Sequence, residues 1–200
     1  ADQARREAGI AKLERLIDVT PEFGTPYLAT ETGSLNPESP WSDYAANHTQ
    51  AAWNELLRIL RRLAKRARAA GTVLLIEGYV NNVVATTAQA EKVLHELGAD
   101  VVGFVLDPFN YQTRADLQTP AESMARIVRT LAPHAKIAHA KDVRYGANGV
   151  ETPKVGDGRA DWRAYAKALA EHAPQLPLVL EHLRPDEIPG CVAKVKAAFS

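Results

Sequence analysis

The sequence predicts an α/β fold in which short parallel strands alternate with amphipathic helices. Five short, largely apolar segments have the character of strands, and a helical pattern follows each of them. Strands that alternate with helices in this way are normally parallel and joined by right-handed crossovers. The chain has 200 residues, 46% of them hydrophobic, and no break in composition. We therefore expect residues 1–200 to form a single domain with a sizeable core.

The first third of the chain is expected to contain two helices and one strand. Residues 25–33 are a short strand-like segment, and residues 34–48 are rich in Pro, Ser and Asn and predict a long loop. Helical spacing of apolar residues extends over 2–19 and, more strongly, over 48–70. The apolar residues that define these two faces are Ile10, Leu13, Leu16, Ile17, Trp53, Leu56, Leu57, Leu60 and Leu63.

The remainder of the chain is a regular alternation. Gly98 and Asp161 mark a helix end and a helix N-cap in this part. Strands are expected over 72–79, 101–109, 136–143 and 177–183, and helices over 87–98, 121–134, 161–174 and 188–199.

Composition excludes several functional classes. The formal net charge of zero argues against a general nucleic-acid binder, and no apolar run is long enough to span a bilayer. The arginine-rich face of residues 58–70 predicts a solvated surface, because no aromatic side chains alternate with it. A single cysteine, Cys191, excludes an internal disulfide and is expected to be a small buried residue. A cytoplasmic protein without nucleic-acid or membrane partners is expected.

Charged or metal-binding side chains recur at the ends of the last four predicted strands. Glu77, Asp107 and Glu181 each follow a run of apolar residues. His139 lies in the predicted strand over 136–143, which falls between Asp107 and Glu181 in the sequence. Carboxyl ends of parallel strands lie at one edge of the sheet, so these side chains should converge. Taken singly, each acid could be a helix N-cap or a loop anchor, and His139 could be a core histidine.

Together, the four side chains predict a divalent-metal site. Three crowded carboxylates repel one another and lose hydration unless a cation neutralises them. Two glutamates, one aspartate and one histidine form a hard ligand set dominated by oxygen. We expect one divalent ion, with Mn²⁺ the leading candidate and Mg²⁺, Co²⁺ and Zn²⁺ as alternatives.

Further polar and aromatic residues are candidates for substrate binding. Lys141 could carry a proton, or it could form a salt bridge with Asp142 or a neighbouring carboxylate. Arg144 could bind a sugar oxygen, a phosphate or a carboxylate, or it could be solvated. Trp41 could form an apolar wall over a sugar ring, or it could pack in the loop. Gly156 and Gly158 lack the spacing of a nucleotide-binding motif and predict a tight loop.

The motifs "LLIEG", "VLDPFN", "HAKD", "VGDGRADW" and "LVLEH", in this order, resemble the xylose-isomerase-like TIM-barrel superfamily of sugar and sugar-phosphate isomerases and epimerases. The resemblance covers about residues 25 to 199. It implies a (β/α)₈ barrel of which this chain carries the last five βα units, with residues 2–19 as the helix before the fourth strand. It also implies one divalent metal held by Glu77, Asp107, His139 and Glu181.

The resemblance further implies a reaction. Glu77 and Glu181 would be the catalytic acid and base on opposite faces of a sugar, a sugar phosphate or a related polyol. The metal would stabilise an enediolate formed by proton transfer. Ketose 3-epimerases of the superfamily usually have a histidine three residues after the strand-end aspartate, whereas this chain has Asn110, which we place among the substrate-binding residues.

Two alternatives to a metal-dependent isomerase or epimerase follow from the same pattern. The chain could be a non-catalytic relative that binds a sugar or a metal. It could also be a metal-dependent phosphodiester hydrolase or endonuclease, although that chemistry generally uses more histidines than the single well-placed His139. An open sheet of five strands would expose two edges, which predicts association, for example as a homo-oligomer.

Overall fold

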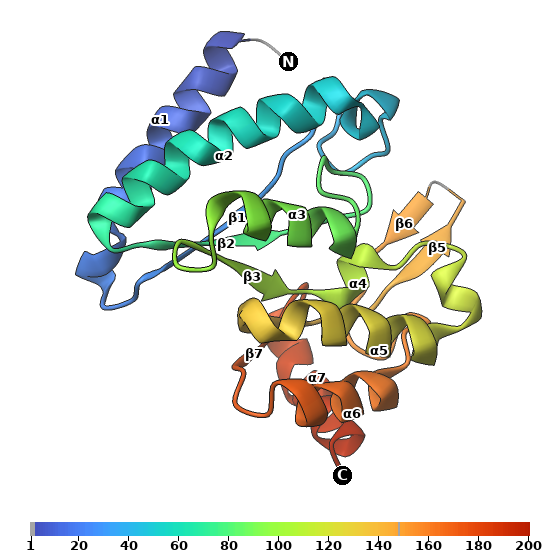
Figure 1. The fold of residues 1–200 in the computed structure, drawn as a ribbon. Helices are drawn as coiled ribbons and strands as arrows, with labels where there is room; N and C mark the ends of the chain where they lie inside the picture. Colours follow the sequence, from blue (N-terminus) through green and yellow to red (C-terminus); the bar gives the residue numbers. More distant parts are fainter. Residues whose placement is uncertain (1–2, 148) are drawn as a thin grey trace. The chain divides into compact units, whose positions relative to one another are not determined.

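A computed structural model describes residues 3–147 and 149–200 and confirms the α/β fold (Figure 1). In the first unit the strand order is β1-β2-β3, and in the second unit β4 lies next to β7. The chain forms two compact units; the first ends at Phe104 and the second begins at Val105. The five strands are β1 (Tyr27–Glu31), β2 (Val73–Glu77), β3 (Val102–Leu106), β4 (Ala135–Ala140) and β7 (Leu178–Leu180).

The first unit pairs its strands in parallel. Tyr27 of β1 is in register with Val73 of β2, and Ile76 of β2 is in register with Phe104 of β3. The middle of β2 is buried, whereas alternate residues of β1 are exposed. The helical elements of this unit are α1 (Gln3–Val19), α2 (Gln50–Ala70), α3 (Thr87–Leu97) and two 3₁₀ turns, η1 (Thr20–Phe23) and η2 (Ala45–His48).

Helices α1 and α2 lie side by side in the first unit (Figure 1). Helix α2 buries the leucine face that the sequence predicts, and Thr49 caps its first turn by accepting a hydrogen bond from the Ala52 N–H. Of the predicted apolar face of α1, Ile10 and Ile17 are buried. Leu16 is 36% exposed and does not belong to the core.

The arginines of α2 are exposed, as predicted, but they are also paired with acids. Arg62 bonds Glu14 of α1 at 2.7 Å, and Arg66 bonds Asp18 of the same helix. Similar ion pairs join Arg61 to Glu96 and Arg68 to Asp100. The positive charge of this face is therefore compensated within the unit.

The second unit contains the parallel pair β4 and β7, in which His139 is in register with Val179. Asp161 caps α6 by accepting a hydrogen bond from the Ala164 N–H at 2.8 Å, which confirms the predicted N-cap. Cys191 is buried, as predicted. The helical elements are α4 (Pro108–Tyr111), α5 (Pro120–Leu131), α6 (Trp162–His172), α7 (Ile188–Ala198), η3 (Asp116–Gln118), η4 (Ala132–His134) and η5 (Pro185–Glu187).

A small hairpin follows β4 that the sequence did not predict. Strands β5 (Arg144–Gly146) and β6 (Gly149–Glu151) pair antiparallel, with Tyr145 opposite Val150. Strands of three residues are too short to produce a recognisable alternation of apolar and polar residues. Among the described residues, no helix combines the length and the apolar character needed to cross a bilayer.

Candidate metal centre

Asp107 follows the fully buried strand β3 and is itself 0% exposed. It is the N-cap of α4, because its Oδ1 accepts a hydrogen bond from the backbone N–H of Asn110 at 3.2 Å. Its Oδ2 lies 2.7 Å from Lys141 Nζ and 3.4 Å from His139 Nδ1. Asp107 is therefore both a helix N-cap, through Oδ1, and a member of a charged cluster, through Oδ2.

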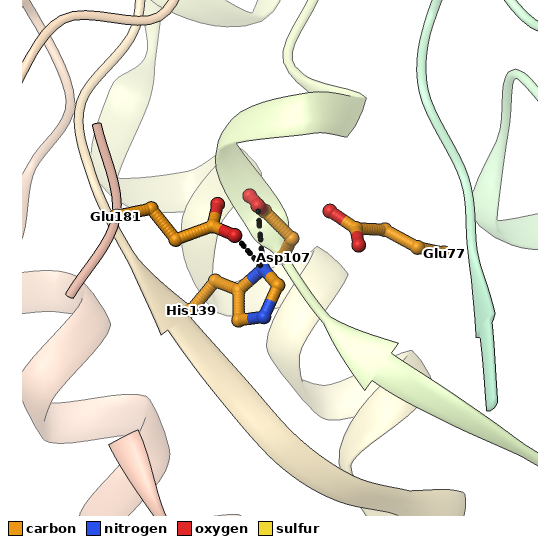
Figure 2. A group of neighbouring side chains, drawn as sticks. All are labelled: Glu77, Asp107, His139 and Glu181. Atoms are coloured by element: carbon orange, nitrogen blue, oxygen red, sulfur yellow. Dashed lines mark ion pairs between the residues drawn. The ribbon is translucent and has the colours of Figure 1, made fainter. Parts of the chain in front are cut away.

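His139 and Glu181 come from neighbouring parallel strands. His139 lies in β4, and Glu181 directly follows β7, where its backbone N–H donates to the carbonyl of Ala140 at 3.0 Å. His139 Nδ1 lies 3.2 Å from Glu181 Oε1. Figure 2 shows the side chains of Asp107, His139 and Glu181 turned toward one another, with dashed lines along the two ion pairs of His139.

Lys141 provides the positive charge of this cluster. Its side chain is only 4% exposed, and Nζ contacts both Asp107 Oδ2, at 2.7 Å, and Glu181 Oε2, at 3.1 Å. Lys141 thus forms its salt bridges with the neighbouring carboxylates of Asp107 and Glu181. Two carboxylates and one ammonium group leave a net charge of −1 when His139 is neutral, so the cluster still favours a further cation.

The electrostatics of the cluster keep both acids ionised. Burial works to raise the pKa of Asp107, but the charge of Lys141 and the hydrogen bond from His139 outweigh it and lower the pKa below its ordinary value. The pKa of Glu181 is lowered in the same way, by His139 and Lys141 against burial. Burial, and secondarily the charge of Asp107, raises the pKa of Tyr165 well above its ordinary value. The carboxylates are therefore available as anionic ligands at neutral pH.

These residues suit a divalent metal. One ligand atom from each of Asp107, His139 and Glu181 lies within 4.8 Å of the others. Metal–ligand bonds of about 2.0–2.2 Å hold ligand atoms at separations of this order. Carboxylate and imidazole donors on neighbouring strand ends, with a residual negative charge, form a set that Mg²⁺, Mn²⁺ or Zn²⁺ could occupy.

Asp142, next to Lys141, holds the loop that contains Gly156 and Gly158 through hydrogen bonds. Its carboxylate accepts hydrogen bonds from the backbone N–H groups of Val143, Gly156 and Ala160 at 2.8, 3.0 and 3.0 Å. A Cβ on Gly158 would lie 2.2 Å from Asp142 Oδ1. The tight loop predicted from "VGDG" therefore closes around a buried acid, and this fixes the chain that carries Lys141.

Tyr165 is hydrogen-bonded to β4, a role that no pattern in the sequence indicates. Its hydroxyl donates to the backbone carbonyl of His139 at 2.8 Å. The ring lies edge-on to Phe109, two residues after Asp107, with centroids 5.3 Å apart. One buried aromatic side chain thus contacts both segments that carry the cluster.

The first unit holds two of the residues predicted from the sequence. Glu77 closes β2, opposite Glu31 of β1, and is partly buried. Trp41 is 55% exposed and packs edge-on against Tyr79 at 6.1 Å. Glu77 is thus the last residue of its strand, and Trp41 lies in the predicted loop between β1 and η2.

Asn110 and Arg144 complete the set predicted from the sequence. Asn110 lies in α4 and is 5% exposed. Arg144 is exposed and bonds Glu151 across the hairpin at 2.7 Å and the Asp157 carbonyl at 3.1 Å. A substrate group that binds Arg144 would therefore share or displace these contacts.

Comparison with known proteins gives a family and a fold. The family model described as "Xylose isomerase-like TIM barrel" matches residues 1–197. No curated protein matches the chain in sequence.

Three solved structures illustrate the similarity. A xylose isomerase domain protein from Planctomyces limnophilus is 17% identical, with a TM-score of 0.71, over 96% of this chain and 65% of that protein. A xylose isomerase-like TIM barrel protein from Mycobacterium smegmatis, in complex with magnesium, is 21% identical, with a TM-score of 0.68, over 99% and 68%. An L-ribulose 3-epimerase is 20% identical, with a TM-score of 0.67, over 100% and 66%. The chain thus spans about two thirds of the length of these structures, and the likeness shows the fold.

Proposed function

Since the chain belongs to the xylose isomerase-like TIM barrel family, we propose that it is a divalent-metal-dependent isomerase or epimerase. The substrate class is a sugar, a sugar phosphate or a related polyol. The observation that carries the proposal is the cluster of Asp107, His139 and Glu181 at successive strand ends, with Lys141 bridging the two carboxylates. An L-ribulose 3-epimerase among the similar structures supports the substrate class.

Glu77 is the proposed fourth ligand. It directly follows Ile76, whose register partner in the first unit is Phe104, and Asp107 comes three residues after Phe104 in the sequence. Both acids therefore leave the carboxyl ends of neighbouring parallel strands, which is where ligands converge in α/β folds. Mn²⁺ stays the leading candidate from the sequence, and the magnesium complex of one similar structure supports Mg²⁺ as the alternative.

Proton transfer is assigned to the two glutamates. A bound divalent cation would supply Lewis-acid polarisation of a substrate carbonyl. Glu181 is ionised because His139 and Lys141 lower its pKa, and its side chain is 27% exposed, so it can reach the substrate. It would accept the proton from the carbon next to the carbonyl, while Glu77 would return a proton on the opposite face.

The remaining predicted residues have binding roles in this proposal. Lys141, 3.1 Å from Glu181 Oε2, orients that carboxylate and can donate to a substrate oxygen. Asn110 would bind a hydroxyl group, Arg144 a phosphate or sugar oxygen, and Trp41 the apolar face of the sugar. The exposed position of Trp41 leaves its ring open to such a contact.

Solvent deuterium exchange tests the proposal directly. The protein is loaded in turn with Mn²⁺, Mg²⁺, Co²⁺ or Zn²⁺ and incubated in D₂O with free ketoses, aldoses and their phosphates. Proton NMR should show loss of the signal from the carbon next to the carbonyl as deuterium replaces its hydrogen, and chelation with EDTA should abolish this exchange. Glu181→Gln should lower the exchange rate by about 100-fold or more, the usual contribution of a general base, while metal content by mass spectrometry stays near one ion per chain.

The matched control is Glu171→Gln on α6, which removes an exposed carboxylate from the same unit. It should leave exchange and metal content unchanged. Retained exchange in Glu181→Gln would reject the proton-transfer role of Glu181. A wild-type protein that binds metal but exchanges no deuterium with any sugar would instead be a binding relative without turnover.

A further inference from the structure

His182, the residue after Glu181, has a backbone conformation that is unusual for its type. Its φ angle is 57°, in the left-handed region, and among residues 3–147 and 149–200 it is the one residue other than glycine with a positive φ. A residue with a Cβ is strained in this region, which is why glycine usually occupies it. The conformation of His182 therefore depends on contacts that hold it.

A side-chain hydrogen bond holds this turn. Nδ1 of His182 donates to the backbone carbonyl of Thr152, and the two atoms are 2.6 Å apart. The residue is otherwise exposed, so packing in the core does not explain why a histidine occupies this position. Strained backbone conformations persist where surrounding contacts hold them, and they are concentrated at functional sites.

The acceptor, Thr152, belongs to a segment that also holds the end of β4. The carbonyl of the next residue, Pro153, accepts a hydrogen bond from the backbone N–H of Asp142 at 2.8 Å. Asp142 directly follows Lys141 in the chain. Two consecutive carbonyls of one segment therefore hold the residues that follow Lys141 and Glu181, the two partners of a buried ion pair.

The position of the Glu181 carboxylate depends on this arrangement. Its Oε1 lies 3.2 Å from His139 Nδ1, and its Oε2 lies 3.1 Å from Lys141 Nζ. On the N-terminal side, the Glu181 N–H donates to the Ala140 carbonyl at 3.0 Å and so continues the pairing of β4 with β7. On the C-terminal side, the next hydrogen bond is that of the His182 ring. The two bonds fix the backbone of Glu181 from both sides.

Apolar packing offers a second explanation of the turn, but not of the histidine. The next residue, Leu183, packs against a buried cluster that consists of Ala140, Val155, Cys191 and Val195. A glycine at position 182 would give the same turn without strain. Packing of Leu183 therefore accounts for the left-handed backbone, whereas the imidazole requires a separate reason.

We propose that His182 is a positioning residue, whose bond to the Thr152 carbonyl keeps the Glu181 carboxylate in place for metal binding and proton transfer, a role that rests on the proposed function. Misplacement of a catalytic group by about 1 Å can lower a rate by about 100-fold, so a bond that fixes the backbone beside it has a large effect. His182 acts only through Glu181, and this makes its role testable by metal binding as well as by turnover.

Two variants separate the hydrogen bond from the turn. His182→Gly allows the left-handed turn and removes the bond. His182→Asn allows both, because asparagine tolerates this conformation and its amide nitrogen occupies the same place along the side chain as Nδ1 of histidine. Titration with Mn²⁺ alone, followed by the EPR signal of free Mn²⁺, should give a Kd about tenfold higher for His182→Gly, about the effect of one lost hydrogen bond. The Kd of His182→Asn should stay within about twofold of wild type.

A double variant tests whether the effect passes through Glu181. Glu181→Ala binds Mn²⁺ more weakly but has no carboxylate left to position, so the addition of His182→Gly should change its Kd by less than about twofold. His172→Gly, which removes a surface imidazole at the end of α6, is the matched control and should bind Mn²⁺ like wild type. Melting temperatures in EDTA should stay close to wild type for both His182 variants, because the residue is exposed.

Several outcomes would overturn the positioning role. One is wild-type Mn²⁺ affinity in His182→Gly, with or without a lower melting temperature, since a merely structural role predicts this result. Another is a Kd for His182→Asn as high as that for His182→Gly. A third is an equal loss of affinity in the Glu181→Ala background, which would place the effect elsewhere. The expected Mn²⁺ affinities without deuterium exchange on any sugar would support the positioning role and reject only the proposed reaction.

Discussion

Two regions of the molecule are rich in ion pairs, and they differ in burial. On the first unit, Arg62 and Arg66 of α2 pair with acids of α1 through side chains that are 42% and 45% exposed. In the second unit, Lys141 is 4% exposed and pairs with Asp107, which is fully buried. Both sets pair a cationic side chain with carboxylates, but water surrounds the first set and is largely excluded from the second.

This difference indicates what each set is for. Exposed ion pairs contribute little to stability, about 0–1 kcal/mol each, because water screens the charges and the side chains lose freedom. Buried charges lose their hydration, and apolar residues of similar size would often be at least as stable. The α1–α2 ion pairs therefore keep a helix face hydrated and neutralise its charge. The Lys141 cluster loses hydration without a clear gain in stability, which indicates a functional role.

The largest effect is expected from Lys141→Met. This variant leaves Asp107 and Glu181 without their buried counter-ion, and removal of one partner of a buried ion pair typically costs about 3–5 kcal/mol. Urea unfolding in EDTA should show a loss of this size. Addition of Mg²⁺ or Mn²⁺ should restore part of it, because a divalent cation neutralises the same carboxylates.

Lys136→Met is the control, since Lys136 lies exposed on the same strand β4. It should change the free energy of unfolding by less than about 0.5 kcal/mol, as surface substitutions usually do. An equally small loss in Lys141→Met would contradict the comparison, because it would mean that the buried acids need no cation.

A smaller effect is expected from Gly158→Ala, which tests the loop that supports the cluster. The new Cβ would lie 2.2 Å from Asp142 Oδ1 and 2.7 Å from the carbonyl of Val143. Asp142 cannot move away without loss of its three backbone hydrogen bonds. Overpacking of this kind costs about 1–3 kcal/mol, to be measured by urea unfolding.

Gly190→Ala, in α7, is the matched control because a Cβ there meets no atom within 4 Å. Alanine in place of a helical glycine should stabilise by up to about 1 kcal/mol. If both glycine variants shifted stability in the same direction, the close approach at Gly158 would not be the cause.

The sequence predicts the cluster well because its members follow a simple rule. Asp107, His139 and Glu181 lie at or near the ends of apolar strands, and the parallel arrangement alone brings such ends together. The roles of Asp142 and Tyr165 could not be predicted in this way. They depend on contacts with residues 14 to 26 positions away along the chain, which leave no periodic pattern.

In the fold, too, elements with a local sequence pattern could be predicted, and elements that depend on tertiary contacts could not. Strands and long helices were predicted to within a few residues, since apolar periodicity reflects which face is buried. The β5–β6 hairpin was missed because three-residue strands carry almost no pattern. The exposure of Leu16, on an otherwise apolar helix face, likewise depends on tertiary packing rather than on local spacing.

The smallest effect is expected from Glu55→Gln on the α1–α2 surface. Hydrogen bonds from Arg58, and secondarily the charges of Arg58 and Arg6, lower the pKa of Glu55 from 4.5 to about 2. Because the pKa is lower in the folded state, the ionised form stabilises the fold above the unfolded pKa, and this contribution is lost as the pH falls from about 4.5 toward 2. The carboxylate is 31% exposed, so solvent screening limits the effect to about 0.2–1 kcal/mol.

Urea unfolding of wild type and Glu55→Gln at pH 7 and pH 3, each at low and high salt, measures this contribution. The difference between the two proteins should shrink at pH 3 and in 1 M NaCl, where the Debye length falls to about 3 Å. The loss in Lys141→Met should change much less with salt, because its charges are shielded from the solvent by the protein. A salt dependence as strong for Lys141→Met as for Glu55→Gln would show that water reaches the buried cluster, and the contrast between the two regions would fail.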